Sequence, residues 1–491
     1  MSTSTTALRP AELYIDGAWT AGNGEPIVTV APATGREVAQ SPSADAAQVE
    51  AALDAARAAF DGGEWSRVGA AGRRDLLHRL ADLMQENRDE LVRIAATELG
   101  TPVSTAPALH VDLPAKYFRW FGDAALRGPM GGYEQPMLLD HDPITTSGML
   151  LREPIGVVAA VVAYNVPVMM SAYKLGGALA AGCSAVLVTS PKSVLLTEAF
   201  VRLVERAGFP RGAVNYVFGA PGTTSAVVGS PKVDMVSFTG SPTVGAKILA
   251  LAAPNLTKTV LELGGKSPNI VLPGTDLRKV VGPSALRFTR NSGQACGATT
   301  RTFVPRADLD EYAALSREFL AGLTVGDPFD PSTVLGPLSS AEHLSTVQGF
   351  LSRATADGAV FPVGGSRPGG DLADGFYLEP TLVTGVSNAA ELAQEELFAP
   401  VGVVIQYDDV DEAIRLANDV RYGLNANIWG PTTEAIEFAR RVRSGTVTVN
   451  GGGGMRPDAP WGGPGASGIG REGGDEGFRE FFEVKHVQWP L

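Results

Sequence analysis

Residues 156–164 read GVVAAVVAY and form the first of five apolar runs between Ile155 and Gly265. The other four are SAVLVTS (184–190), AVNYVFG (213–219), MVSFTG (235–240) and TVLELGG (259–265). Helical patterns separate them, near residues 169–181, 195–207, 222–229 and 243–252. Continuous apolar strands that alternate with helices indicate an α/β fold with a parallel sheet covered on both faces. Such sheets bind ligands at the carboxyl ends of their strands, so we expect the functional site there.

The sequence on either side extends this pattern. The first 125 residues are predicted to be mainly helical, because apolar residues recur at helical spacing from Val49 to Phe60. Residues 137–152 place two apolar runs around a turn that contains Pro and Ser, which predicts a hairpin whose exposed edges invite a partner subunit. From Thr300 to Asn450 a second series of strands and helices predicts a second sheet, followed by a glycine-rich segment and a terminal strand, FFEVKHVQW (481–489).

Composition excludes several classes of protein. The 491 residues allow about two to four domains, and 44% hydrophobic residues suffice for a large core. The net charge of −13 makes nucleic acid a poor partner. The sequence lacks the roughly 20 uninterrupted apolar residues of a membrane span and the pattern of a signal peptide, so we expect a cytoplasmic protein. Cys183 and Cys296 have no CxxC or His spacing, so we expect neither a metal site nor a disulfide framework.

A candidate nucleotide site follows the fourth apolar run. Residues 238–245 read FTGSPTVG, in which Gly240 lets the backbone turn and Ser241 can cap the following helix. The free N–H groups and the positive end of that helix suit a pyrophosphate. An ordinary capped turn is the alternative, because the spacing is not G-x-G-x-x-G. A Walker-type loop ending at Ser267 is disfavoured, since Val260 stands where that motif needs glycine.

Three residues are candidates for catalysis. Glu262 ends an apolar strand beside two glycines, where burial would raise its pKa and make it a general base; a buried Glu bonded to backbone amides is the alternative. Cys296 lies in the stretch NSGQACGA (291–298), and a thiol at a helix start would have its thiolate favoured, although an inert buried cysteine is common. Asn165 follows the first strand and can donate to an oxyanion or only cap a turn.

Together these segments resemble the aldehyde dehydrogenase superfamily over nearly the whole chain. The matching motifs are EPIGVV (153–158), YNVP (164–167), FTGSPTVG (238–245), LELGGKSP (261–268), GQAC (293–296), EELFAP (395–400) and SGIGRE (467–472). The resemblance implies that an aldehyde is oxidised to its acid with NAD or NADP, through a thiohemiacetal and a thioester on cysteine. The alternatives are a cofactor-independent thiol esterase or hydrolase, and a non-catalytic binding protein on the same fold.

The resemblance also implies residue roles. Cys296 is the expected nucleophile, Glu262 the base and Asn165 the oxyanion donor, while Lys174 and Glu472 assist proton transfer. The expected cofactor contacts are Ser241 at the pyrophosphate, Glu396 and Phe398 at the nicotinamide riboside, and Gly240, Gly245, Leu263 and Lys192.

The family fold has two Rossmann-type αβα domains and a small β hairpin that pairs between subunits. We therefore expect a homodimer or homotetramer. The dinucleotide-binding domain is expected to span residues 1–130 and 151–262, the catalytic domain 263–474, and the bridging strands 131–150 and 475–491.

The chain departs from the family pattern where the adenosine ribose would bind. The usual V-x-K-P-S-E is altered, so that Val188 replaces the ribose-binding Lys and Pro191 replaces the Glu. Loss of a carboxylate removes repulsion against a 2′-phosphate, and Lys192 lies one residue on, so we expect NADP to be accepted beside NAD. The alternative is a Lys192 side chain that only points to solvent. Tyr164 stands where Trp is usual, and Ala399 where Gly is usual.

The substrate entrance is expected to be apolar. Its expected lining residues are Val166, Met169, Met170, Tyr173, Met455 and Trp461, with Ala295 and Gly297 beside the nucleophile. Because these residues include no Arg or Lys, an apolar, medium-sized aldehyde is favoured over an acidic semialdehyde. Core packing is the alternative role for these side chains.

Overall fold

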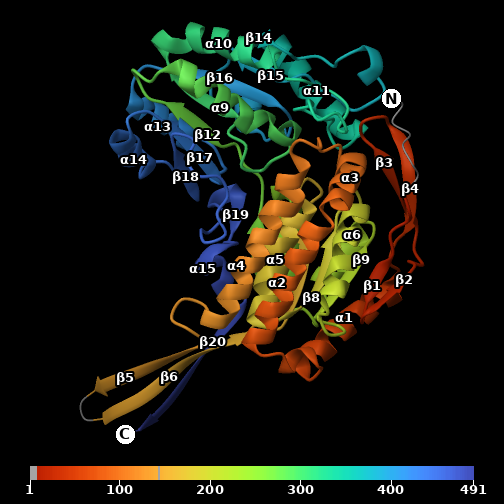
Figure 1. The fold of residues 1–491 in the computed structure, drawn as a ribbon. Helices are drawn as coiled ribbons and strands as arrows, with labels where there is room; N and C mark the ends of the chain where they lie inside the picture. The colour runs from red at the N-terminus through yellow and green to blue at the C-terminus, as the bar shows by residue number, and fades with distance from the viewer. Residues whose placement is uncertain (1–7, 142–143, 491) are drawn as a thin grey trace.

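The computed structural model describes residues 8–141 and 144–490 and contains two large sheets, each in its own half of the molecule (Figure 1). The first sheet has the strand order β19-β11-β10-β7-β8-β9-β1-β2. Its five central strands are parallel and correspond to the five apolar runs. They are β7 (Val157–Val162), β8 (Ser184–Thr189), β9 (Val214–Phe218), β10 (Met235–Thr239) and β11 (Lys258–Glu262). The predicted parallel core is confirmed.

Helices on both faces explain why these strands are apolar at nearly every position. On one face lie α5 (Pro167–Ala181) and α6 (Val194–Ala207), over which α2 (Ala70–Glu86), α3 (Arg88–Leu99) and α4 (Leu113–Arg127) pack (Figure 1). On the other face lie α1 (Ala46–Asp61), α7 (Pro221–Val228) and α8 (Pro242–Ala252). With no face left to water, every side chain of β7 and β8 is buried.

The prediction that the N-terminal region is mainly helical is wrong for its first part. Four strands precede α1, namely β1 (Leu13–Ile15), β2 (Ala18–Thr20), β3 (Pro26–Ala31) and β4 (Arg36–Pro42). The first two pair with each other at the edge of the first sheet, and the other two form a separate hairpin. These strands are short and partly exposed, so they lack the continuous apolar runs on which the prediction relied.

The second sheet has the order β14-β15-β16-β13-β12-β17-β18. Its strands are β12 (Pro268–Val271), β13 (Arg301–Pro305), β14 (Val360–Val363), β15 (Thr381–Thr384), β16 (Val401–Tyr407), β17 (Asn425–Trp429) and β18 (Thr446–Val449). The helices of this half include α9 (Leu277–Thr289), α10 (Leu309–Ala321), α11 (Ala341–Ala356), α13 (Val410–Asn418) and α14 (Thr432–Ala439). The predicted second sheet is confirmed. Its strand β12 and the helix α9 lie before Thr300, the residue at which the sequence predicts this series of strands and helices to begin.

A three-stranded sheet projects from the first half (Figure 1). The predicted hairpin, β5 (Glu134–His141) and β6 (Ile144–Pro154), pairs with the terminal strand β20 (Phe482–Pro490). Beyond Phe482 every side chain of β20 is exposed, including Val484 and Trp489. The expected segments 1–130, 131–150 and 475–491 also contain residues 1–7, 142–143 and 491, which lie outside the described residues.

One strand joins the two halves beside the site. After the second sheet the chain returns to the first as β19 (Gly468–Ile469), which pairs antiparallel with β11 and sets Gly468 opposite Glu262. Within residues 8–141 and 144–490, no helix combines the length and apolar character needed to cross a bilayer.

Candidate active site

Cys296 lies in the loop between α9 and β13, and its side chain is partly exposed. Asn291 and Ser292 turn this loop with φ angles of 52° and 54°, a left-handed conformation that costs a non-glycine residue about 1–3 kcal/mol. The ring of Trp461 packs against Gly297, where a Cβ would lie 2.7 Å from the indole. The predicted nucleophile is therefore held on a fixed loop with an aromatic wall beside it.

The expected thiolate is not favoured in this structure. Cys296 follows a 3-10 turn (Arg290–Gly293) rather than opening a helix. Burial of the thiol group raises the pKa of Cys296 to about 12, and the nearby carboxylates of Glu396 and Glu262 add to this effect. Sequence could not reveal this, because both carboxylates come from other segments of the chain. By contrast, Cys183 is fully buried, and its Sγ donates to the carbonyl of Phe481 at 3.6 Å.

Asn165 lies between β7 and α5 and reaches the nucleophile loop. Its Nδ2 donates to the carbonyl oxygen of Gln294 at 2.9 Å, two residues before Cys296. Asn291 Nδ2 donates to the carbonyl oxygens of Asn165 at 3.3 Å and Gln294 at 3.2 Å. The amide is thus more than a local turn cap, because it is fixed against the loop that carries the thiol.

Glu262 ends β11 with only 3% of its surface exposed. Neither carboxylate oxygen has a hydrogen-bond partner among the described residues, so the alternative of a Glu bonded to backbone amides does not hold. A Cβ at Gly462 would collide with Oε1 of Glu262, so a side chain there would displace the carboxylate. Burial and then the charge of Glu472 raise the pKa of Glu262 well above its usual range, against the opposing charges of Lys174 and Arg471.

A buried ion pair lies next to Glu262. Lys174 Nζ donates to Glu472 Oε1 at 2.5 Å, and both side chains are at least 95% buried. Ser237 joins them: its hydroxyl accepts from Lys174 Nζ at 3.2 Å and donates to Glu472 Oε1 at 2.9 Å. Sequence analysis missed Ser237, for which the only signal was a hydroxyl within the apolar run MVSFT.

The predicted pyrophosphate site is an open helix start. Ser241 caps α8 by accepting from Val244 N at 3.3 Å. A Cβ at Gly245 would lie 2.7 Å from Leu263, so glycine lets α8 pack against the end of β11. Gly240 similarly lies against the ring of Phe238.

Glu396 and Phe398 lie on the second half and face the first. Glu396 accepts from Gly265 N at 3.0 Å, and a Cβ at Gly264 would collide with its carboxylate. Burial raises the pKa of Glu396 to about 7. Phe398 is held at φ 56°, and its carbonyl accepts from His343 Nε2 at 2.9 Å.

Lys192 is exposed, as the alternative interpretation has it, but its side chain also has contacts within the protein. Its Nζ donates to Ser340 Oγ at 3.0 Å and lies 5.3 Å from the ring centroid of Tyr164. Val188, which stands where the family has Lys, is buried within β8. Contact of Lys192 with a 2′-phosphate stays a prediction.

The expected substrate-lining residues fall into two groups. Met169, Met170 and Tyr173 are buried on α5, whereas Val166, Ala295, Gly297 and Trp461 are partly exposed and Met455 is exposed. Tyr173 Oη lies 2.9 Å from Tyr117 Oη, which donates to the carbonyl of Arg456 at 3.0 Å. This contact ties α4 and α5 to the glycine-rich segment that contains Met455.

Two arginines that no sequence motif indicates lie near the nucleophile loop. Arg290 lies six residues before Cys296, and Arg287 lies one turn earlier on α9, where its Nη2 donates to Thr448 Oγ1 at 3.2 Å. Neither has a carboxylate within ion-pair distance among the described residues.

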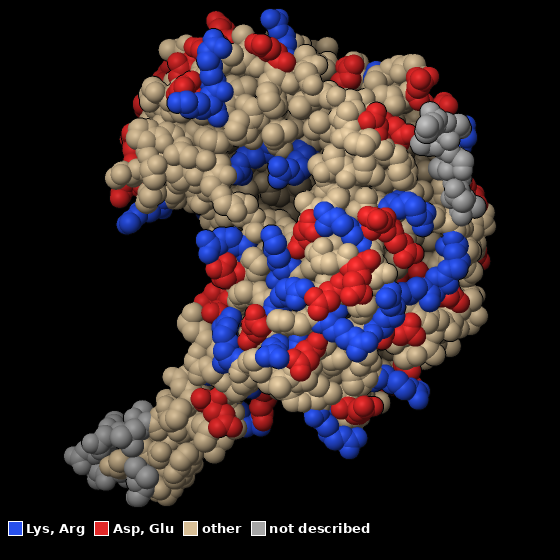
Figure 2. All heavy atoms as spheres, in the orientation of Figure 1, with Lys and Arg blue, Asp and Glu red and all other residues tan. Residues whose placement is uncertain are grey.

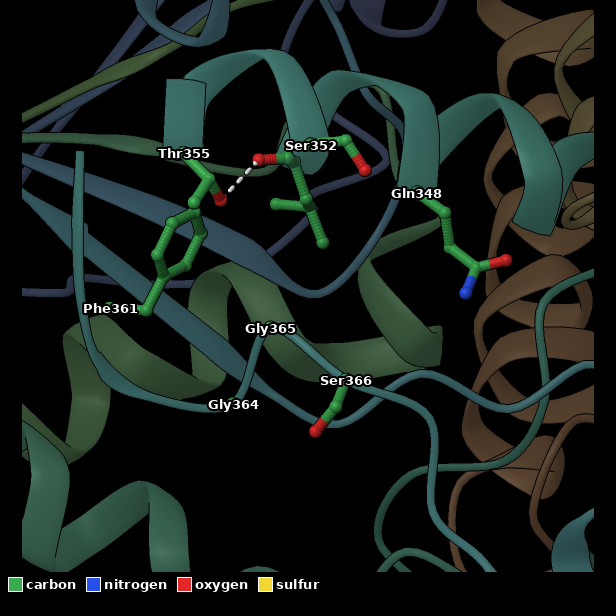
Figure 3. A pocket seen from close by; sticks show the side chains of 8 residues that line it. Gln348, Ser352, Thr355, Phe361, Gly364, Gly365 and Ser366 are labelled. Carbon is green, nitrogen blue, oxygen red and sulfur yellow. Dashed lines mark hydrogen bonds between the residues drawn. The ribbon is translucent and has the colours of Figure 1, made fainter. Parts of the chain in front are cut away.

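A hollow of 290 Å³ lies elsewhere, between α11 and the chain around β14 (Figure 3). Its lining includes Gln348, Phe361 and Ser366 and contains none of the predicted site residues. In the described parts of the chain, no three His, Cys, Asp or Glu side chains are grouped so as to hold a metal ion.

The chain is similar in sequence and fold to known enzymes. A family model described as the aldehyde dehydrogenase family matches residues 19–487. A cysteine-to-alanine mutant of aldehyde dehydrogenase C from Pseudomonas syringae, solved with NAD+ and octanal, is 37% identical over 98% of each chain, with a TM-score of 0.92. An indole-3-acetaldehyde dehydrogenase solved with NAD+ is 36% identical over 99% of this chain and 97% of its own, with a TM-score of 0.94. The NAD+ complex of a Mycobacterium tuberculosis aldehyde dehydrogenase is 35% identical over 98% of each chain, with a TM-score of 0.93.

Proposed function

The chain belongs to the aldehyde dehydrogenase family, whose members oxidise aldehydes with NAD or NADP, and we propose that in this chain Cys296 forms the covalent bond to the substrate. Three groups from separate segments support the proposal. They are the partly exposed Cys296, the Asn165 amide bonded to its loop, and the buried carboxylate of Glu262, which has no hydrogen-bond partner among the described residues and raises the pKa of the Cys296 thiol. The proposed reaction converts the aldehyde to its carboxylic acid.

The residues with which the two halves face each other fit a dinucleotide. The α8 start capped by Ser241 would hold the pyrophosphate, and the carboxylate of Glu396 would hold the riboside hydroxyls beside Phe398. Thr239 supports this fit, because its buried hydroxyl next to Gly240 has no partner within the described chain. When bound, the oxidised nicotinamide supplies a hydride acceptor.

The first half-reaction is assigned to Cys296 and Asn165. The Cys296 thiol loses its proton to water, and the Sγ thiolate then bonds to the aldehyde carbon to give a thiohemiacetal oxyanion. The free N–H of the Asn165 amide and the Cys296 backbone N–H hold that oxygen. Collapse of the oxyanion restores the carbonyl and releases hydride from the same carbon, which leaves a thioester on Cys296.

The second half-reaction is assigned to Glu262. A water donates its proton to the Glu262 carboxylate and attacks the thioester, so that the C–S bond breaks and the acid leaves. The proton on Glu262 must then reach solvent, and the Lys174–Ser237–Glu472 group lies beside it as a route. Because the environment favours the protonated form of Glu262, turnover rises with pH.

An apolar, medium-sized aldehyde is the proposed substrate class. The buried Met169 and Met170 and the ring of Trp461 support an apolar passage to the thiol. The similar proteins solved with octanal or named for indole-3-acetaldehyde take aldehydes of this kind, which favours the same class here.

The remaining assignments follow the expected organisation. Residues 1–130 and 151–262 are assigned to dinucleotide binding, 263–474 to catalysis, and 131–150 with 475–491 to oligomerisation. The exposed Val484, Val487 and Trp489 of β20 support a homodimer or homotetramer built on that sheet. The proposed compartment is the cytoplasm.

The test is a panel of aldehydes offered with NAD and with NADP, in which the reduced nicotinamide is measured. Octanal and a chain-matched ω-oxo acid form the key pair, since Arg287 and Arg290 would favour the acid if they line the entrance. The proposal expects higher kcat/KM for octanal. Hydrolysis of an activated ester without reduced nicotinamide from any aldehyde would instead support a thiol esterase.

A further inference from the structure

A contact of Lys192 crosses from one half of the molecule to the other. Lys192 belongs to the loop after β8 in the first half, whereas Ser340 caps α11 in the second half by accepting from His343 N at 3.3 Å. The Lys192 ammonium donates to Ser340 Oγ at 3.0 Å. On the face that Figure 2 shows, the surface is hollowed between the two halves.

On the first half, the ring of Tyr164 contacts both Lys192 and the second half. Lys192 Nζ lies 5.3 Å from the centroid of its ring, within range of a cation–π interaction. The same ring meets Phe398 of the second half edge to face, with centroids 6.1 Å apart. Lys192 and Tyr164 therefore reach the second half at two neighbouring points.

Hydrogen bonds within the second half link the residues near Lys192 to the loop of Cys296. His343, in the first turn of α11, binds the carbonyl of Phe398, while Ser339 N donates to Gln294 Oε1 at 3.0 Å on the nucleophile loop. On the first half, Tyr164 directly precedes Asn165. A shift at Lys192 would thus act on the mouth of the cofactor site and on the loop of Cys296 together.

We propose that Lys192, held by Ser340 and Tyr164, is a clasp between the two halves that slows the release of the dinucleotide. The inference rests on the proposed function, which places the cofactor between Ser241 of one half and Glu396 and Phe398 of the other. Cofactor and clasp then span the same two halves, so that the cofactor leaves more easily when the clasp is open. A lysine suits this role, because its single charge sits on a flexible stem that can detach and reattach.

The test measures NADH dissociation by stopped-flow fluorescence, which needs no turnover. Lys192→Met and Ser340→Ala should each raise the dissociation rate about fivefold, as expected for loss of one hydrogen bond from an exposed lysine. The double variant should release NADH no faster than either single variant. Ser340→Asp keeps the helix cap and offers Lys192 a carboxylate, so it should slow release. Lys116→Met, which changes an exposed lysine on α4, is the matched control and should release NADH at the wild-type rate.

Each other outcome decides against the clasp. Unchanged release in Lys192→Met, additive effects in the double variant, or faster release in Ser340→Asp would overturn it. An effect confined to NADPH would assign Lys192 to the 2′-phosphate instead. If the wild-type chain bound neither dinucleotide, the proposed function would fail as well, so the two failures are distinguishable.

Discussion

The ammonium of Lys174 lies 2.5 Å from a carboxylate oxygen of Glu472, and the two side chains are sealed from solvent in the first half of the molecule. Their charges act on Glu262 in opposite directions: Glu472 raises the pKa of that carboxylic acid, and Lys174 lowers it. Burial is the largest influence on the ionisation of the proposed base, and a pair that need not touch the substrate adjusts it further.

Replacement of Lys174 by Met should move the pH dependence of turnover to higher pH, because Glu262 loses the positive charge that lowers its pKa. It should also lower the free energy of unfolding by about 3–5 kcal/mol, since Glu472 is left as a buried, unpaired charge. A pH–kcat profile and urea unfolding measure the two effects. Lys116→Met is the control, and an unmoved midpoint of the profile would separate Lys174 from Glu262.

Glu262→Gln should change how stability depends on pH. The pKa of Glu262 is raised in the folded chain above its ordinary value of 4.5, so the folded state binds this proton more tightly than the unfolded state. Its contribution is fully present below the unfolded pKa and is lost as pH rises towards the folded pKa. Glutamine cannot ionise, so the variant should gain on wild type as pH rises from about 5 towards the folded pKa. A difference in unfolding free energy that stays constant over this range would contradict the burial effect.

Asn165→Ala should lower kcat by about a hundredfold to a thousandfold, the usual loss when one oxyanion donor is removed. The variant also loses the 2.9 Å hydrogen bond to the carbonyl of Gln294, so its thermal stability should be measured beside its kinetics. The loss should fall on the initial burst of reduced nicotinamide. A burst within tenfold of wild type would mean that another donor holds the oxyanion.

Gly462→Ala should displace the proposed base. A methyl group there collides with Oε1 of Glu262, and the φ of +135° is one that side-chain-bearing residues rarely adopt. Deacylation should therefore slow more than acylation. Gly369→Ala is the matched control, since a Cβ at Gly369 meets no atom within 4 Å; equal kinetics in the two variants would count against the assigned position of Glu262.

The parallel core of the first sheet was predictable because each of its five strands lies in one continuous apolar run. The helix expected near 169–181 is Pro167–Ala181 in the structure, and the one expected near 195–207 is Val194–Ala207. Strands β3 and β4 were missed, since they are half exposed and their pattern is neither continuous nor strictly alternating. The motif positions of Cys296, Glu262 and Asn165 were available from sequence. In the structure Asn165 bonds to the loop that carries Cys296, and Glu262 lies close enough to raise the pKa of the thiol.

The electrostatics of the site could not be read from sequence. The pKa of Cys296 depends on carboxylates from β11 and from the segment before β16, and the contact of Lys192 with Ser340 joins residues 148 positions apart. Such effects arise only when distant segments meet, whereas the motifs describe each segment separately.

The most direct test of the account is to trap the acyl group on Cys296. Glu262→Gln is mixed with NAD and octanal, quenched in acid before hydrolysis, and digested for mass spectrometry, with Cys296→Ala treated in the same way. The proposed mechanism predicts one reduced nicotinamide and one octanoyl group per subunit, on the peptide that contains Cys296, and neither product from Cys296→Ala. Reduced nicotinamide with no acyl group on that peptide, or an acyl group on Cys183, would contradict it.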